Sequence, residues 1–187
     1  ANKVKIEISK HYNKEIIIKE INNTGDNKID IRLSELGGKG LFSKNIENEL
    51  LNKNIDLAVH ALKDLPSFDT EGLVTNCFLK RNNSNEVMIS NSNKKLNDLV
   101  PGSIVGTSSF RREFQLKRIR KDLNFKLIRG NVDTRIRKLK SGEYDAIILA
   151  KAGLSSLNLE KEITQEFSNN DLIPSAGQGT IAVQCRK

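Results

Sequence analysis

Short aliphatic runs alternate with helix-like segments along the 187 residues, and this alternation constrains the fold more than any other feature. Runs rich in β-branched and aliphatic residues predict strands at 15–21, 55–62, 72–79, 86–90, 103–106, 125–129, 145–150 and 179–185. Helices are expected at 43–54, with Ser43 as N-cap, and from near Ser109 and Val132. Such alternation predicts an α/β fold with parallel pairing. The polar, turn-rich stretch 80–85 is the candidate domain boundary.

Composition argues against several classes of protein. The longest aliphatic run, 146–150, is far shorter than a membrane span, and no basic-then-apolar leader opens the sequence. Cys77 and Cys185 lie in apolar runs far apart in the sequence, so we expect small core residues and a reducing compartment rather than a disulfide framework. His11 and His60 have no ligand-like spacing, so no metal site is predicted.

The excess positive charge is concentrated in one stretch of the chain. The formal net charge is +8, from 31 Lys and Arg against 23 Asp and Glu. Residues 111–140 hold 12 of the basic and 3 of the acidic residues, so this basic block alone carries +9. Such a block predicts an anionic partner, and nucleic acid, membrane headgroups and a polyanionic small molecule all fit.

Two arginines stand where a helix should begin. Arg111 and Arg112 follow the turn Thr107, Ser108 and Ser109, although a helix N-terminus carries partial positive charge and disfavours cations. The hydroxyls and the first free N–H groups of the helix would form an anion site, and a bound anion would offset the repulsion. Arginine suits bidentate pairing with carboxylate or phosphate. A solvated basic helix face is an equal alternative on this stretch alone.

A second segment repeats this arrangement. Arg129 ends a predicted strand, and Arg135 lies one turn into the helix that follows it. Both segments would lie at the carboxyl ends of parallel strands, where open α/β sheets bind their ligands. Two converging basic clusters favour an anion with several charged groups over two unrelated turns.

A third segment places an acid at a strand end. Pro66 biases Leu65 towards extended geometry, so Asp64 should follow the strand 55–62 rather than enter a helix. Such a carboxylate is commonly only a turn former, but one facing a basic cleft can donate a proton or stabilise a developing cation. The glycine loop 37–42 carries Lys39 and lacks the spacing of a nucleotide-binding P-loop.

Five of these segments together closely resemble the porphobilinogen deaminases, the family also called hydroxymethylbilane synthases. They read GGKGLFSKNIENEL, DLAVHALKDLP, VGTSSFRREFQL, LIRGNVDTRIRKLKSGEYDAIILAKAGL and IPSAGQGTIAVQCR, in the family's order and roughly its spacing. The resemblance implies two α/β domains like those of periplasmic binding proteins, with mixed, mostly parallel sheets and a cleft between them. Domain 1 would comprise 1–79 plus 179–187, and domain 2 would comprise 80–178.

The family resemblance also implies a reaction. These transferases condense four porphobilinogen molecules into the linear tetrapyrrole hydroxymethylbilane, with release of ammonia, in haem biosynthesis. A dipyrromethane cofactor on a cysteine thioether anchors the growing chain, and every pyrrole bears an acetate and a propionate. The implied partners are porphobilinogen and pyrrole polycarboxylates, without nucleic acid or membrane. A monomer in the cytoplasm is implied, or in the plastid if the source is eukaryotic.

The same resemblance assigns roles to individual residues. Asp64 matches the catalytic aspartate, which assists loss of the ammonium group and stabilises cationic azafulvene and pyrrolic intermediates. The other matching positions hold the cofactor and substrate or flank the cleft, and no metal is implied. They are Lys39, Lys63, Thr107, Ser108, Ser109, Arg111, Arg112, Arg129, Gly130, Asn131, Arg135 and Gln178.

Three features depart from the family pattern. The sequence lacks the family's first strand with its Thr-Arg-x-Ser segment, and it lacks the third domain, where the cofactor-bearing cysteine is expected. Ser155 and Ser156 stand where the family usually has an arginine at the second position. These departures indicate a fragment or a lineage under relaxed constraint, and an isolated chain without turnover.

Two functions from other classes remain as alternatives. One is a non-catalytic anion-binding module of the periplasmic-binding-protein type. The other is an RNA-binding protein, which the basic block alone would allow. Only Phe114 and Phe125 among the nine aromatic residues fall inside the block, so stacking platforms for bases are not evident.

Overall fold

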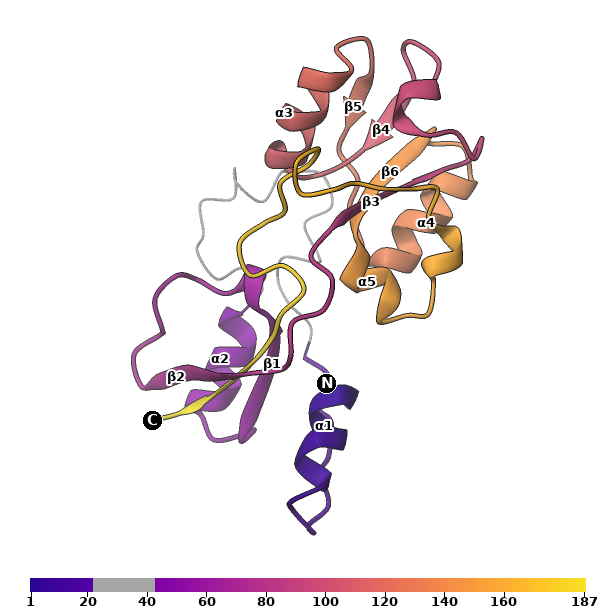
Figure 1. The fold of residues 1–187 in the computed structure, drawn as a ribbon. Helices are drawn as coiled ribbons and strands as arrows, with labels where there is room; N and C mark the ends of the chain where they lie inside the picture. Colours follow the sequence, from indigo (N-terminus) through magenta and orange to yellow (C-terminus); the bar gives the residue numbers. More distant parts are fainter. Residues whose placement is uncertain (22–42) are drawn as a thin grey trace. The chain divides into compact units, whose positions relative to one another are not determined.

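The structure, a computed structural model, describes residues 1–21 and 43–187, which fall into two compact units (Figure 1). Unit 1 contains the described residues 1–21, 43–81 and 180–187, and unit 2 contains residues 82–179. Within residues 43–187, the chain passes from one unit to the other at 81/82 and at 179/180. Unit 2 is an insertion between two stretches of unit 1.

The described residues of unit 1 form a three-stranded antiparallel sheet in the order β1-β8-β2. Its elements are α1 (Asn2–Ser9), α2 (Lys44–Leu51), β1 (Leu57–Ala61), the 3-10 turn η1 (Leu62–Asp64), β2 (Leu73–Phe78) and β8 (Ile181–Arg186). The hydrophobic cluster that the structure describes in this unit is small: Leu50 of α2 packs with Ala58 and Leu73. Burial alternates along β1, as expected for a strand with one covered face.

Unit 2 contains a five-stranded mixed sheet in the order β5-β4-β6-β3-β7. Its elements are β3 (Glu86–Ser90), η2 (Leu96–Asp98), β4 (Ile104–Gly106), α3 (Phe110–Ile119), β5 (Asn124–Lys126), α4 (Val132–Lys140), β6 (Ala146–Ala150), α5 (Lys151–Ser155), η3 (Glu160–Glu162) and β7 (Gln165–Glu166). Strand β4 is parallel to β5 and β6, whereas β3 is antiparallel to β6 and β7.

Alternate residues of the central strands supply two separate cores in unit 2. Met88 and Ile148 pack on one face with Leu116 of α3. Val87 and Leu149 belong to the other core, which includes residues of α4 and α5. The sheet is thus covered on both faces, which is why β3 and β6 read as continuous buried runs rather than as alternating ones.

The α/β class is confirmed, and the sheet of unit 2 is mixed as predicted. Among the described residues, however, parallel pairing is confined to β5-β4-β6, so the sheets are not mostly parallel. The helices expected near Ser109 and Val132 are α3 and α4. Helices α1 and α5 were not predicted, because neither has a long apolar period.

Two other expectations about unit 1 are wrong. Residues 15–21 form no strand in the structure, because β-branched residues need a neighbouring strand to pair with, and Ile17 is largely exposed. Cys77 is exposed rather than part of the core, since the second half of β2 is open to solvent. Cys185 is partly buried, and both thiols are free.

The two crossings of the chain meet at Gly179. Its φ is +85°, and the Asn82 backbone N–H donates to its carbonyl oxygen at 2.8 Å. An added Cβ would lie 2.6 Å from the carbonyl oxygen of Asn82, a backbone atom that cannot rotate away. Glycine is therefore required here by both conformation and space.

Replacing this glycine should destabilise the chain more than its conformation alone explains. Gly142 has a similar φ of +83° and open space around it, so Gly142→Ala should cost about 1–2 kcal/mol in the free energy of unfolding. Gly179→Ala should cost at least about 1 kcal/mol more, because the methyl group also overlaps backbone. Denaturant titration of both variants measures the difference, and equal losses would contradict the steric argument.

Candidate functional site

Two helices of unit 2 begin at the same edge of its sheet. Helix α3 follows β4 and helix α4 follows β5, and these strands are parallel neighbours. The Ser108 hydroxyl donates to the carbonyl oxygen of Ile128 at 2.7 Å, which joins the two turns directly. The N-cap side chain of α4, Asn131, accepts from the Thr134 N–H at 2.9 Å. The two predicted basic segments therefore come together in space.

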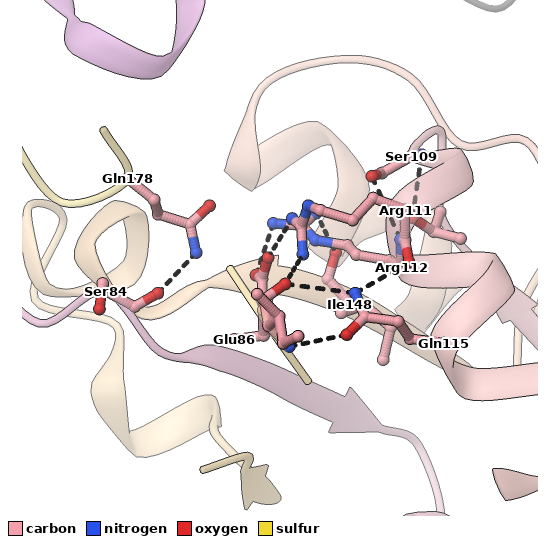
Figure 2. A network of polar contacts seen from close by, with 10 residues as sticks. Ser84, Glu86, Ser109, Arg111, Arg112, Gln115, Ile148 and Gln178 are labelled. Atoms are coloured by element: carbon pink, nitrogen blue, oxygen red, sulfur yellow. Dashed lines mark hydrogen bonds and ion pairs between the residues drawn. The ribbon is translucent and has the colours of Figure 1, made fainter. Parts of the chain in front are cut away.

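The arginines at the start of α3 are paired with a buried carboxylate (Figure 2). Glu86, the first residue of β3, is fully buried, and its Oε1 accepts from Arg111 Nη2 at 2.5 Å. Its Oε2 accepts from Arg112 Nη2 at 2.7 Å. Burial pushes the pKa of Glu86 upwards, but the two guanidinium groups outweigh this and hold the pKa below its usual value. An acid of the chain itself therefore compensates the cations at this helix start.

The two arginines differ in their access to solvent. The Arg112 residue is only 7% exposed, and its Nη1 donates to the carbonyl oxygen of Ile148 at 3.0 Å. Its Nε is buried and has no hydrogen-bond partner among the described residues. The Arg111 side chain is 29% exposed, and its Nη1 donates to the carbonyl oxygen of Ile173. Donors for an additional anion thus remain on both side chains.

The turn before α4 brings further basic residues to this edge. Arg129 is buried, whereas Arg135 is partly exposed and its Nε donates to the carbonyl oxygen of Gly130 at 2.7 Å. The φ of Gly130 is +107°, and an added Cβ would lie 2.6 Å from the Thr134 methyl carbon. The turn therefore requires glycine here, and it fixes where Arg135 lies.

The hydroxyl groups of the first turn mainly hold the turn together. The Thr107 hydroxyl oxygen is fully buried and accepts from the Ser109 N–H at 3.1 Å. The Ser109 hydroxyl oxygen accepts from the Arg112 N–H at 3.4 Å as the N-cap of α3. In the structure these hydroxyl groups support the backbone that presents the arginines, and their role as anion ligands stays a prediction.

The segment that leads back to unit 1 is tied to the same network. Gln178 is buried, and its Nε2 donates to the carbonyl oxygen of Ser84 at 2.7 Å (Figure 2). Gln115 of α3 accepts from the Ile173 N–H at 2.8 Å and donates to the carbonyl oxygen of Ile173 at 3.2 Å. Both connecting stretches are thus held close to the arginine pair.

Much of the basic block has other roles. The Arg120 guanidinium pairs with Asp122 and donates to the carbonyl oxygens of Leu96 and Leu99. Lys117 pairs with Glu113 at 2.8 Å, one helical turn away. The basic block therefore does not form a single surface for one ligand. The candidate site involves only those of its residues that lie at the starts of α3 and α4.

Asp64 lies in unit 1, at the end of the 3-10 turn that follows β1. Asp64 and Lys63 are both exposed, and Leu65 is extended at φ −79° and ψ 149°, as its place before Pro66 predicts. Lys39 lies outside the described residues. Ser156 ends α5, is exposed, and donates its hydroxyl to the carbonyl oxygen of Ala152 at 2.8 Å.

A buried polar cluster in unit 1 includes the histidine of β1. His60 and Glu47 are both nearly buried, and the Gln184 Nε2 donates to Glu47 Oε1 at 3.2 Å. His60 Nε2 has no hydrogen-bond partner among the described residues. Burial lowers the pKa of His60, although Glu47, Gln184 and Asp64 act in the opposite direction. The imidazole is therefore neutral near neutral pH.

This histidine should make the stability of the chain depend on pH. Because its pKa is lower in the folded state, it contributes stability above the unfolded pKa of about 6.5, and that stability is lost as the pH falls below this value. His60→Gln should flatten the loss between neutral and mildly acidic pH, as measured by denaturant unfolding. His11, exposed beyond α1, offers the control variant His11→Gln, which should leave the loss unchanged. A similar flattening in both variants would contradict this assignment.

Two other kinds of feature are absent from the described residues. No group of three or more His, Cys, Asp and Glu side chains in 1–21 and 43–187 is arranged to hold a metal ion. Within the same ranges, no helix has the length and apolar character to cross a membrane.

Together these features define a class: an α/β protein with arginine side chains gathered at the N-termini of two adjacent helices. The family model described as "Porphobilinogen deaminase, dipyromethane cofactor binding domain" matches residues 1–187. The chain belongs to the porphobilinogen deaminase family. This confirms the family predicted from the sequence motifs.

Curated relatives agree with this membership. The porphobilinogen deaminase of Bacillus pumilus is 51% identical over 170 residues, which is 90% of this chain and 55% of that protein. That of Bacillus velezensis is 47% identical over all 187 residues and 59% of its own length. The enzyme of Bacillus subtilis is 47% identical over 91% of this chain and 54% of its own length. The chain thus spans little more than half the length of these relatives.

Solved structures show weaker similarity. A putative methionine-binding lipoprotein of Bacillus subtilis is 14% identical, with a TM-score of 0.48 over 77% of this chain and 68% of that one. A putative periplasmic sulfonate-binding protein of Methylobacillus flagellatus is 17% identical, with a TM-score of 0.44 over 83% and 47%. These values are too low to carry an argument about function.

Sequence reasoning missed Glu86. The signal was present, because a glutamate opens a strand whose other residues are apolar or small, and such an acid is rarely buried without a cationic partner. Its partners, however, lie 25 and 26 positions further on, and only the fold brings them together.

Proposed function

We propose that the protein to which this chain belongs condenses four porphobilinogen molecules into the linear tetrapyrrole hydroxymethylbilane, releasing ammonia at each step. The observation that carries the proposal is the joining of two arginine-bearing helix starts at one sheet edge, which Ser108 and Ile128 link. Each pyrrole brings two carboxylates, and several guanidinium groups at one edge suit such a ligand. Family membership points to the same reaction.

The residues present fit the dipyrromethane cofactor that the family model names. The fit is judged by the hydrogen-bond donors that the arginines offer to the cofactor carboxylates. Arg112 has a buried Nε without a partner among the described residues, and Arg111 is partly exposed. Arg111, Arg112, Arg129 and Arg135 would hold its carboxylates, supported by Thr107, Ser108, Ser109, Gly130 and Asn131. When bound, the cofactor supplies a primer whose terminal pyrrole carbon accepts each new unit.

Asp64 and Lys63 have complementary proposed roles. Each addition forms a carbon–carbon bond to the aminomethyl carbon of porphobilinogen and breaks its carbon–nitrogen bond, so positive charge develops on the pyrrole as ammonia leaves. The exposed Asp64 carboxylate would stabilise that charge, and Lys63 would pair with a substrate carboxylate. Lys39 and Gln178 are further proposed site residues; the side chain of Gln178 supports the connecting segment at Ser84.

We further infer a cytoplasmic monomer that acts without membrane or nucleic acid. Two free thiols, one of them exposed, suit a reducing compartment. The curated relatives described above are bacterial. The two domains of the prediction, with a cleft between them, stay part of the proposal.

Binding by the isolated chain tests the site. The 187-residue chain should bind a synthetic dipyrromethane tetracarboxylate reversibly, and more weakly as salt rises, because the contacts are charge-assisted. Arg111→Met should weaken binding about tenfold or more. Arg118, exposed on the same helix, provides the control Arg118→Met with near-normal binding. Isothermal calorimetry gives the affinities, and tighter binding of an RNA oligonucleotide would favour the nucleic-acid alternative instead.

The bound pyrrole should not become covalent on this chain. After incubation with porphobilinogen and denaturation, the mass of the chain should be unchanged, since the anchoring cysteine is expected elsewhere in the family. Cys77 is exposed, so the experiment is a genuine test. A stable gain of two pyrrole units on Cys77 or Cys185 would overturn this expectation.

The role of Asp64 is tested in the whole protein. Asp64→Asn should preserve the fold and lower the rate of tetrapyrrole formation by about 10²–10³-fold, because the amide keeps the shape and loses the charge. Asp69, another exposed carboxylate of unit 1, supplies the control Asp69→Asn. Spectrophotometric rates with porphobilinogen separate the two, and near-normal turnover of Asp64→Asn would remove this residue from the mechanism.

A further inference from the structure

Glu86 contacts both arginines at the start of α3. One carboxylate oxygen accepts from each guanidinium, at 2.5 Å and 2.7 Å (Figure 2). The carboxylate is fully buried, so it stays in place between the two forks. A carboxylate that bridges two forks restricts both at once, because guanidinium donors lie in a rigid plane.

Other contacts limit the remaining freedom of the same guanidinium groups. The Ile148 carbonyl oxygen of β6 accepts from Arg112 at 3.0 Å, and the Ile173 carbonyl oxygen accepts from Arg111. Gln115 also holds the Ile173 backbone through its N–H and its carbonyl oxygen. These partners are neutral, so Glu86 is the acid that the structure places in an ion pair with each arginine.

The two arginines still have donors to offer. A guanidinium group carries five N–H donors, and each of these side chains uses two nitrogen atoms in the contacts above. A ligand carboxylate can therefore bind an outer edge while Glu86 keeps the inner edge. Glu86 also reduces the charge of the pair from two to one, which lessens the repulsion between adjacent guanidinium groups and the helix start.

We propose that Glu86 is a positioning residue for the carboxylate-binding site: by pairing with Arg111 and Arg112 it aims their outer edges at the ligand. The identity of that ligand, a pyrrole polycarboxylate, rests on the proposed function. The proposal predicts whether ligand binding becomes weaker or tighter when the charge of Glu86 is removed. Removing the charge of Glu86 raises the charge of the site yet weakens binding, whereas a merely competing carboxylate would weaken binding when present and tighten it when removed.

The experiment compares four forms of the 187-residue chain with a synthetic dipyrromethane tetracarboxylate as probe. They are the unchanged chain, Glu86→Gln, Glu86→Asp and the control Glu162→Gln. Glu162 pairs with Lys140 at 3.0 Å at the surface, away from the arginine pair. Calorimetry at low and high salt should show about tenfold weaker binding for Glu86→Gln. Glu86→Asp, which keeps the charge, should recover most of the affinity, and Glu162→Gln should bind normally.

A second pair of variants covers the case in which Glu86→Gln fails to fold. Arg112→Met removes one buried cation, so Glu86→Gln in that background leaves no uncompensated buried charge at Arg112. If Glu86 positions Arg111, the double variant should bind about tenfold more weakly than Arg112→Met alone. Cooperative thermal unfolding of each variant confirms that folded proteins are compared.

Each outcome bears on the proposal. Equal or tighter binding after the loss of Glu86, in either background, overturns the positioning role and leaves the proposed function intact. Absence of binding by the unchanged chain overturns both, because no pyrrole ligand then uses the site. Weaker binding with recovery in Glu86→Asp supports the role, since a general loss of structure would not be recovered by restoring the charge.

Discussion

The central strands of unit 2 have to be covered on both faces, and the site depends on this constraint. All five residues of β3 and the first four of β6 are buried, so each sheet face needs its own layer. Helix α3 covers one face, while α4 and α5 cover the other. Since β4 and β5 are parallel neighbours, the helices that follow them begin at one edge although they pack on opposite faces. Hydrophobic burial thus places two helix N-termini together.

The charged side chains of the site belong to helices and strands whose positions are determined by hydrophobic packing. The helix starts attract anions, yet the chain puts two arginines, Arg111 and Arg112, in the first turn of α3. Glu86, which belongs to a third element, β3, compensates the positive charge of these arginines with a buried carboxylate. Because the two guanidinium groups lower its pKa, the ionised form of Glu86 is favoured despite its burial. The site therefore keeps a net positive charge, although Glu86 compensates part of the charge of its arginines.

Local patterns of the sequence predicted the local structure well. Helices α3 and α4 begin where the sequence predicted them, near Ser109 and Val132. The two turn segments that hold most of the predicted site residues meet at one edge, because parallel neighbours place their carboxyl ends together. These results needed only periodicity, turn residues and a topological rule.

What the sequence could not predict depends on pairing between distant segments. Whether Ile16 to Ile18 form a strand depends on a partner, and the described residues supply none. Cys77 looks like a core residue by its neighbours, yet the register of β2 against β8 shifts between Val74 and Cys77 and leaves the thiol exposed. The pairing of Glu86 likewise required the tertiary fold. Strand propensity is a property of the segment itself, whereas burial depends on the segments that pack around it.

The insertion of unit 2 into unit 1 has a consequence for the order of folding. Strand β8 lies between β1 and β2, so the sheet of unit 1 lacks its middle strand until the ribosome has made the whole of unit 2. Closing a loop of about 100 residues by diffusion carries a large entropic cost. Once unit 2 has folded, its two ends are joined by the Asn82–Gly179 hydrogen bond, and most of that cost has been met. We therefore expect unit 2 to fold first and to bring β8 close to β1 and β2, so that the sheet of unit 1 is completed last.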